Sequence, residues 1–401
     1  MIKLFRSYPR VIWLLAISMA INIMGISFLW PLNTLYIVEV LGKTVSIAGI
    51  VLMLQQGAGI LGSLSGGYLF DKWGAKRTIL LGTSSAIIFV FLLTFADTLT
   101  QYVLLMLLLG LSTGLVFPSM YAMAGAVWQE GGRKAFNILY VAQNLGVALG
   151  SVLGGIVAQV SFRLIFPANA VAFVIFLLII VFGFKKKYWI LSSEQTVIHK
   201  NSLPDSVFVK RQFRSYLPLI ILAFAFILTW MPYVQWQTSI SSYMKTLGIS
   251  LSMYTLLWTI NGALIVLGQP IVAIVTNKLL KTTKQQMISG TLIFFLAYAI
   301  LFNNTLYSGF LLAMVIMTFG EMLVWPAVPT AADQLAPKGK KGFYQGVVSG
   351  AASAGRMLGF LVGGFLYDYT SMNNLLIIML FLFLVAILGF VYHDRFSSPL
   401  S

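Results

Sequence analysis

The sequence predicts an all-α integral membrane protein in which twelve transmembrane helices form two pseudo-symmetric halves of six. Three observations support this fold class. Hydrophobic residues make up 59% of the 401 residues and charged residues only 9%, against roughly a quarter charged in soluble domains. The apolar stretches are about 20 residues long, which is the length of a helix that crosses a bilayer. The glycine-rich segment 146–155 recurs as 355–364, half a chain later, with its four glycines in register.

Twelve apolar stretches bounded by charged or turn residues define the expected helices. They cover residues 10–40, 45–70, 77–96, 100–126, 136–160, 164–184, 217–243, 250–276, 285–303, 308–331, 343–367 and 373–392. All should be helical, because a backbone in hydrocarbon must satisfy its hydrogen bonds within its own segment and strand-like alternation is absent. The expected organisation is a six-helix bundle at 1–184, a cytoplasmic linker at 185–216 and a second six-helix bundle at 217–401.

The basic residues sort to one side of the expected membrane. With the N-terminus inside, the cytoplasmic segments hold 22 of the 26 Lys and Arg residues. Such an asymmetry is typical of multi-pass membrane proteins and predicts an even number of spans. We therefore expect a protein of the plasma membrane with both termini in the cytoplasm. The net charge of +16 follows from this topology, so it does not indicate a nucleic-acid partner.

The composition argues against several kinds of chemistry. The chain has no cysteine and only two histidines, His199 and His393, which lie in polar segments, so no metal cluster is expected. The expected spans contain neither a paired acid and base nor a Ser/His/Asp arrangement, and there is no glycine-lysine loop that could cradle a phosphate. We expect a protein that is not an enzyme, binds no cofactor and draws no energy directly from ATP.

The repeated glycines indicate close helix packing. Glycines four residues apart leave a bare groove on one face of a helix, where a second helix can approach closely in lipid. The predicted packing glycines are Gly146, Gly150, Gly154 and Gly155 in the first half and Gly355, Gly359, Gly363 and Gly364 in the second. A chance recurrence is the alternative, but Phe117-Pro118 also recurs, as Trp325-Pro326. Repeated multi-span units are typical of secondary transporters, whose substrate site lies between the repeats.

The segment from Gly67 to Arg77, GYLFDKWGAKR, resembles the signature between helices 2 and 3 of the major facilitator superfamily. Only Ala75 departs from it, since a basic residue is usual there. The resemblance implies the major facilitator fold, alternating access and a conformational gate formed by Gly67, Asp71, Lys72, Gly74, Lys76 and Arg77. A carboxylate in this position can offset the N-terminus of a neighbouring helix. An ordinary tight turn, with charges that only set the topology, is the alternative.

Helix 5 also resembles the glycine motif of the drug:proton antiporter branch, although Ser151 replaces the usual proline. The arginine that this branch often carries in helix 4 is missing, because Met106 or Gly110 occupies its position. The resemblance further implies a central cavity lined by helices 1, 4, 7 and 10.

Two ionisable residues lie deep in the expected spans of the second half. Glu321 in helix 10 costs several kcal/mol there unless it is protonated, hydrated or paired, which suits a group that loads and releases a proton. Arg356 in helix 11 lies at a similar depth. A pair between them that forms in one conformation and breaks in another would act as a proton switch. A neutral structural glutamate and a fixed bridge between the helices are the alternatives.

Polar and aromatic residues on the expected cavity helices are candidates for substrate binding. They are Asn22, Asn33, Tyr36, Tyr121, Trp230, Tyr233, Gln235, Trp236 and Trp325. The helix 7 cluster, WMPYVQWQ, combines aromatic rings with amides and suits bulky, partly apolar molecules. A belt of aromatic residues at the membrane interface is the alternative for this cluster.

These features together predict a secondary transporter that exports small amphipathic compounds in exchange for protons, with the proton gradient as its energy source. The expected partners are a small-molecule substrate, protons and the lipid bilayer, and we expect a functional monomer. The alternative is a carrier of a metabolite such as a sugar, an organic anion or a lipid precursor, in which Arg356 would bind an anionic group.

Overall fold

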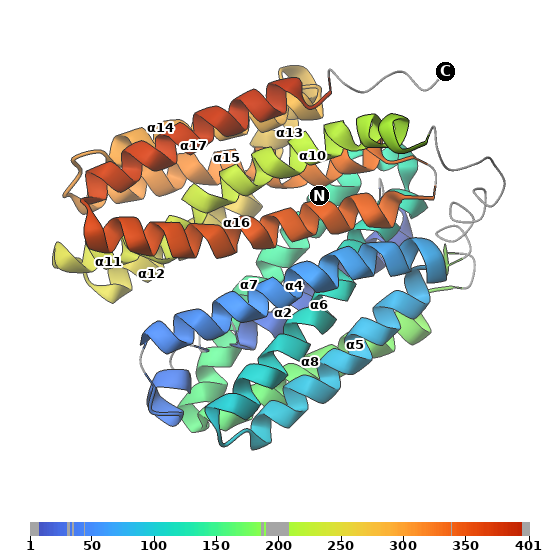
Figure 1. The fold of residues 1–401 in the computed structure, drawn as a ribbon, viewed down its shortest axis with the longest axis horizontal. Helices are drawn as coiled ribbons and strands as arrows, with labels where there is room; N and C mark the ends of the chain where they lie inside the picture. The colour runs from blue at the N-terminus through green and yellow to red at the C-terminus, as the bar shows by residue number, and fades with distance from the viewer. Residues whose placement is uncertain are drawn as a thin grey trace. The chain divides into compact units, whose positions relative to one another are not determined.

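The computed structural model describes residues 8–29, 33, 36–43, 45–185, 188–189, 208–337 and 339–394. The regular elements in these ranges are all helical (Figure 1). Their contacts divide the chain into two compact units, Met1–Asn201 with Ala336–Gly350, and Ser202–Leu335 with Ala351–Ser401. Residues 336–350 thus group with the first unit, although the sequence places them in the second bundle. Most of the expected linker at 185–216 lies outside the described residues.

The first unit is built from helices that follow one another with short connections. They are α2 (Arg10–Leu29), η1 (Tyr36–Val40), α4 (Val45–Trp73), α5 (Ala75–Leu92), η2 (Leu93–Phe95), α6 (Leu99–Val127), η3 (Gln129–Gly131), α7 (Arg133–Val160), η4 (Phe162–Leu164), α8 (Ile165–Leu178) and η5 (Ile179–Gly183). Within this unit α2 packs on α7 and α8, α4 packs on α6, and α5 packs on α6 and α8.

The second unit is also built from consecutive helices, and two of its expected spans are interrupted, one after residue 233 and one at residue 268. Its helices are α10 (Phe208–Tyr233), η6 (Val234–Gln237), α11 (Ser239–Thr246), α12 (Leu251–Leu267), α13 (Gln269–Lys278), α14 (Thr283–Leu301), α15 (Tyr307–Leu335), α16 (Lys341–Tyr369) and α17 (Met372–Tyr392). Here α14 packs on α15 and α17, and α10 packs on α17 and α15. The first turns of α16 belong to the first unit and the rest to the second.

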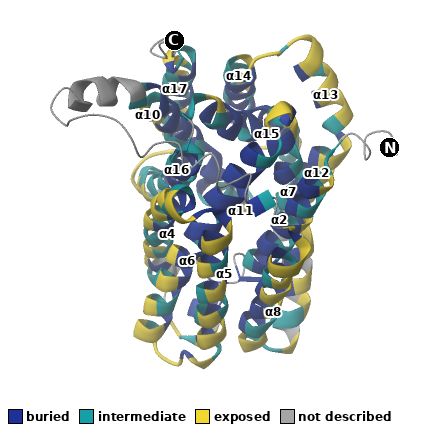
Figure 2. Cartoon of the chain, turned by 90° about the vertical axis from the view of Figure 1, so that its right-hand side faces the viewer, coloured by how far each residue is buried: buried dark blue, intermediate teal, exposed yellow. Residues whose placement is uncertain are grey.

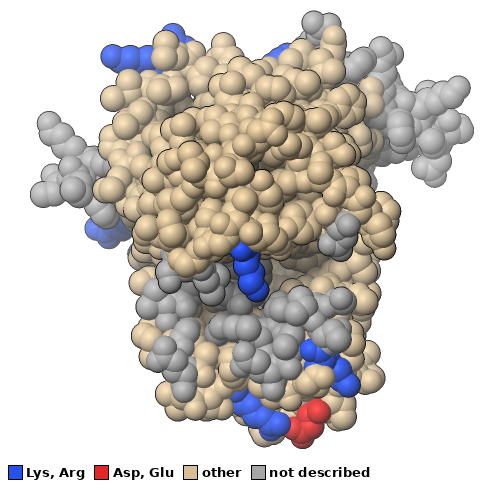
Figure 3. All heavy atoms as spheres, turned by 90° about the vertical axis from the view of Figure 1, so that its left-hand side faces the viewer, with Lys and Arg blue, Asp and Glu red and all other residues tan. Residues whose placement is uncertain are grey.

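Each of the twelve expected ranges contains a helix. Among the described residues, nine helices are long and apolar enough to cross a membrane, or ten if one bent pair is counted as a single span. The count of twelve is consistent with this result and stays a prediction. Large apolar side chains are exposed, such as Ile88 on α5 and Val171 on α8. Figure 2 shows exposed stretches along both helices in yellow. Charged residues are sparse on the face in Figure 3. Such a surface suits lipid rather than water.

The repeated glycines pack in an equivalent way in the two units. A Cβ at Gly150 would lie 2.7 Å from Ser27 of α2, and one at Gly154 would lie 3.0 Å from Phe28 Cα. Gly146 faces Ala20 of α2 in the same manner. In each case the helices touch backbone to backbone, where a side chain would not fit.

In the second unit, three glycines of α16 face α10 and the start of η6. Cβ atoms at Gly355 and Gly359 would each lie 2.8 Å from a carbonyl oxygen of α10, while Gly363 lies over Gln235. Gly364 is different, because no described atom lies within 4 Å of its Cβ position. No packing partner for Gly364 is thus seen in the described part of the chain, and its packing role stays a prediction. Gly155 lies in α7, next to Gly154.

One expected span, residues 250–276, is not a single helix. It consists of α12 and α13, which meet at Gly268 with a bend of 55°. Pro270 follows the break, and proline cannot donate the backbone hydrogen bond that would continue a helix. The bend lies against α15, because a Cβ at Gly268 would lie 3.2 Å from Met322 Cε.

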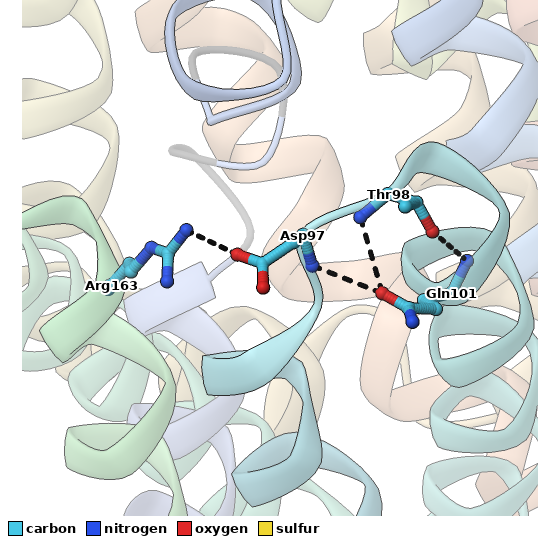
Figure 4. A network of polar contacts seen from close by, with 4 residues as sticks. All are labelled: Asp97, Thr98, Gln101 and Arg163. Atoms are coloured by element: carbon cyan, nitrogen blue, oxygen red, sulfur yellow. Dashed lines mark hydrogen bonds and ion pairs between the residues drawn. The ribbon is translucent and has the colours of Figure 1, made fainter.

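A polar network fixes the start of α6 in the first unit (Figure 4). Thr98 and Gln101 form a capping box. The backbone amide of Gln101 donates to Thr98 Oγ1 at 3.3 Å, and the backbone amide of Thr98 donates to Gln101 Oε1 at 3.3 Å. Beside it, Arg163 forms an ion pair with Asp97 at 2.6 Å. Both partners are exposed, so this pair contributes little to stability.

Candidate functional site

Asp71 in the last turn of α4 binds the first turn of α16. Its Oδ1 accepts a hydrogen bond from the Gly342 amide at 2.9 Å, and its Oδ2 accepts one from the Phe343 amide at 2.7 Å. Amides at the start of a helix have no partner within the helix and carry the positive end of its dipole. The carboxylate of Asp71 therefore caps a helix that begins about 270 residues later.

Glycines allow this close approach. A Cβ at Gly342 would lie 2.5 Å from the Gly67 carbonyl oxygen, and one at Gly346 would lie 2.6 Å from the Ser63 carbonyl oxygen. Gly74 has a φ of 83°, a left-handed conformation that ends α4 and lets the chain turn into α5. The gate predicted from the sequence thus contains a cap, a groove and a tight turn.

The basic residues of the predicted gate lie on the surface. Lys72, Lys76 and Arg77 are exposed, and the Lys72 ammonium lies 5.6 Å from the centre of the Tyr68 ring. The sequence did not suggest the role of Lys341. Its Nζ donates at 3.1 Å to the carbonyl oxygen of Gly125, in the last turn of α6, where the negative end of a helix dipole favours a cation. The start of α16 is therefore held by one acidic and one basic contact.

Glu321 is buried in the middle of α15 and binds a residue that sequence reasoning missed. Only 2% of its surface is exposed, and its Oε1 accepts a hydrogen bond from Asn261 Nδ2 of α12 at 2.8 Å. The same amide donates to Thr318 Oγ1 at 2.9 Å. All three side chains are buried. A polar residue within an expected span was the available signal for Asn261.

Arg356 lies in α16 and does not pair with Glu321 in this structure. Its Nη2 donates to Ser353 Oγ at 3.0 Å, and its guanidinium carbon lies 4.8 Å from the centre of the Trp230 ring. Among the described residues, both partners are electrically neutral. The switch in which Arg356 pairs with Glu321 stays a prediction for another conformation.

Three of the four aromatic candidates of the second unit form one cluster, which we call the tryptophan stack. Trp230 of α10 and Trp325 of α15 lie face to face, with ring centres 4.5 Å apart and an angle of 8° between the planes. Tyr233 meets Trp325 edge to face at 5.2 Å, and Phe226 and Phe294 pack around the same ring. Three predicted cavity residues and Arg356 are thus brought together.

Gln235 and Trp236 serve the fold in this structure. The Gln235 amide group donates to the carbonyl oxygens of Met231 and Gly359 at 2.9 and 2.7 Å, and its Oε1 accepts from Ser239 at 2.8 Å. Its hydrogen-bonding capacity is therefore used inside the protein, which argues against direct binding of a substrate. Trp236 is fully buried, and its carbonyl oxygen accepts a hydrogen bond from Tyr254 at 2.9 Å.

The candidates in the first unit make separate contacts. Asn33 Oδ1 accepts a hydrogen bond from Tyr102 at 2.9 Å, and Tyr36 stacks on the same tyrosine at 5.2 Å. Tyr121 of α6 accepts a hydrogen bond from Gln143 of α7. Asn22 is buried in α2. The structure therefore does not bring these four residues into one cluster.

Comparison with known proteins identifies the family that the chain matches. A family model described as "Major Facilitator Superfamily" matches residues 15–349 and, in a second match, residues 237–400. The "Uncharacterized MFS-type transporter YttB" of Bacillus subtilis (strain 168) is 49% identical over 387 residues, covering 96% of each chain.

Two more distant similarities cover most of the chain. The "Multidrug resistance protein MdtH" of Aeromonas hydrophila subsp. hydrophila is 25% identical over 375 residues, covering 90% of this chain and 89% of that protein. The crystal structure of the human organic anion transporter MFSD10 (TETRAN) superimposes with a TM-score of 0.74 at 14% identity. That match covers 96% of this chain and 100% of the human one, and it shows the fold alone.

Proposed function

Because this chain belongs to the Major Facilitator Superfamily, and is thus a multi-pass membrane transporter of small molecules, we propose that it exports small amphipathic compounds in exchange for protons. Transport proceeds by alternating access in the plasma membrane, with both chain ends in the cytoplasm. Relatives named as multidrug resistance proteins support an export role. The tryptophan stack supports an amphipathic substrate, since flat aromatic surfaces bind molecules of this kind.

The buried glutamate carries the proton-coupling part of the proposal. A carboxyl group at 2% exposure in an apolar helix is unfavourable as an ion unless hydrogen-bond donors or a cation hold it. Asn261 supplies a donor at 2.8 Å. The free energy of ionising the Glu321 carboxyl group depends on its local contacts. A conformational change that alters those contacts therefore drives proton uptake or release.

The contact of Asp71 with α16 supports the alternating-access part. It joins α4 of the first unit to the start of a helix that continues into the second unit. We propose that this cap holds the cytoplasmic side closed in one state and releases α16 in the other.

Transport by purified protein in liposomes with an imposed pH gradient tests the proposal. Wild type should move an amphipathic dye faster with the gradient than without it, whereas Glu321→Gln should lose this acceleration. Glu130→Gln is the matched control, because Glu130 is an exposed residue of η3. Unchanged gradient dependence in Glu321→Gln would refute the proton role.

A carrier of a metabolite is the second candidate function, and Arg356 favours it. An arginine with neutral partners inside a span is suited to an anionic group of a metabolite. Saturable uptake of such an anion, lost in Arg356→Ala, would support this candidate over export.

A further inference from the structure

We infer that the substrate carries an anionic group, such as a carboxylate, that binds Arg356 while a flat apolar part lies against the tryptophan stack. The inference rests on the proposed function, since it takes the second unit to be part of a transporter, and it adds the charge of the substrate. It commits to an organic anion rather than to the cationic compounds that an aromatic surface alone would also accept.

The first argument is the uncompensated charge of Arg356. The side chain is half-buried in the middle of α16, and its partners among the described residues are the hydroxyl of Ser353 and the ring of Trp230. Arginines inside membrane spans are usually paired with an acid, because an isolated charge in hydrocarbon is strongly unfavourable. An anionic substrate would supply the missing negative charge.

The second argument is the fixed orientation of the guanidinium. It lies 4.8 Å above the Trp230 ring, which is itself stacked at 4.5 Å on Trp325. Gly355 permits this arrangement, because a Cβ there would collide with Trp230 Cβ. A guanidinium has five N–H donors, and Ser353 accepts one of them. The remaining edge can hold a carboxylate by two parallel hydrogen bonds.

The third argument is a buried donor within the same cluster. Trp230 Nε1 is buried and has no hydrogen-bond acceptor among the described residues. Buried donors in native proteins nearly always have a partner. An anionic or carbonyl oxygen of a bound molecule would satisfy it, whereas the hydrogen atoms of an ammonium group would not.

Three probes that share one ring system and differ in charge test the inference. Purified protein in detergent is titrated with 2-naphthoate, 2-naphthamide and 2-naphthylmethylammonium, and binding is measured by equilibrium dialysis. We expect wild type to bind the naphthoate about tenfold or more tightly than either other probe. Arg356→Gln should abolish this preference. Arg356→Lys should retain part of the preference for naphthoate, because lysine keeps the positive charge but lacks the planar guanidinium that forms two parallel hydrogen bonds to a carboxylate.

Arg163→Gln is the matched control, because Arg163 is an exposed arginine of η4, far from Arg356 in the sequence, and it should keep the full preference (Figure 4). Size-exclusion chromatography identifies variants that do not fold. If Arg356→Gln is one of them, the wild-type preference and Arg356→Lys decide. Equal binding of the three probes by wild type, a preference for the ammonium probe or no binding of the naphthoate would overturn the inference. So would an unchanged preference in a folded Arg356 variant.

Failure of the anion site is distinguishable from failure of the proposed function, because binding in detergent requires no gradient. Naphthoate that binds with the expected preference but is not moved in liposomes under a pH gradient would leave the anion site standing and refute proton-driven transport. Gradient-driven flux of all three probes without preference for the naphthoate would support transport and overturn the anion site.

Discussion

Asp71→Asn should loosen the contact between α4 and the start of α16. The asparagine has nearly the same size as aspartate, so packing is conserved. However, its side chain offers one oxygen where the carboxylate offers two. Burial raises the pKa of Asp71 to about 7, so at a pH above 7 the asparagine also lacks the negative charge that faces the helix dipole. The two amides now bound at 2.9 and 2.7 Å would share one neutral acceptor.

The size of the effect follows from these two losses. A hydrogen bond to a charged group contributes about 1.5–3 kcal/mol and a neutral one about 1 kcal/mol. A charge next to a helix terminus adds about 0.3–1 kcal/mol. We therefore expect the docked arrangement to lose about 2–3 kcal/mol, which is a shift of roughly 30- to 150-fold in the equilibrium between docked and released α16.

A single cysteine can measure this shift, because the natural chain contains none. Ser63 is buried in α4, and its carbonyl oxygen lies directly beneath Gly346 of α16. In membrane vesicles, Ser63→Cys should react slowly with N-ethylmaleimide, at a rate set by the released fraction. Asp71→Asn should raise this rate by roughly thirtyfold or more. The control is Asp97→Asn, the same exchange at an exposed position elsewhere in the first unit.

The cap would have no role in holding α16 if Asp71→Asn changed the labelling rate by less than about threefold. An equal increase in the Asp97→Asn control would also contradict the reasoning, because it would indicate a general loosening of the protein.

Three further changes test other contacts. Lys341→Gln should raise the same Ser63→Cys labelling rate by about tenfold or more, because one charged hydrogen bond to α6 is lost. No increase would show that this contact is not formed in the membrane. Asn261→Leu should reduce pH-driven transport about tenfold in a protein that still folds, because Glu321 loses the hydrogen bond from the Asn261 amide. Wild-type flux would contradict this. Gly359→Ala should lower the melting temperature by several degrees, since overpacking costs about 1–3 kcal/mol. Gly364→Ala should not lower it. Equal melting temperatures of the two variants in scanning calorimetry would be inconsistent with the glycine packing.

The fold and the family could be predicted from the sequence because both depend on strong local patterns. The length of the apolar runs and the signature around Asp71 need no knowledge of distant contacts, and the all-α membrane fold and the family are confirmed. The spacing of the glycines showed that a groove exists. It could not show which of two adjacent glycines enters the groove: Gly363 lies over Gln235, whereas no described atom lies within 4 Å of the Cβ position of Gly364.

The partners of the site residues could not be predicted, for physical reasons that differ between residues. Asp71 binds backbone amides, which every residue type possesses, so no side chain in the sequence indicates its partner. Asn261 and Glu321 are 60 positions apart and meet only because α12 packs on α15. Gln235 was assigned to the substrate because a polar group in a span requires partners, although polarity alone does not say whether these come from the protein or from a ligand.

The bend between α12 and α13 links the conformation of the second unit to the thickness of the bilayer. At 1.5 Å per residue, α12 is about 25 Å long and α13 about 15 Å, so neither alone covers a hydrocarbon layer of about 30 Å. If the two arms cross together as one broken span, their combined reach along the membrane normal grows as the 55° bend straightens. A thicker bilayer favours the straighter form and a thinner one the more folded form. Because the bend at Gly268 lies against Met322, the neighbour of Glu321, any change in this bend would occur directly beside the buried carboxyl group.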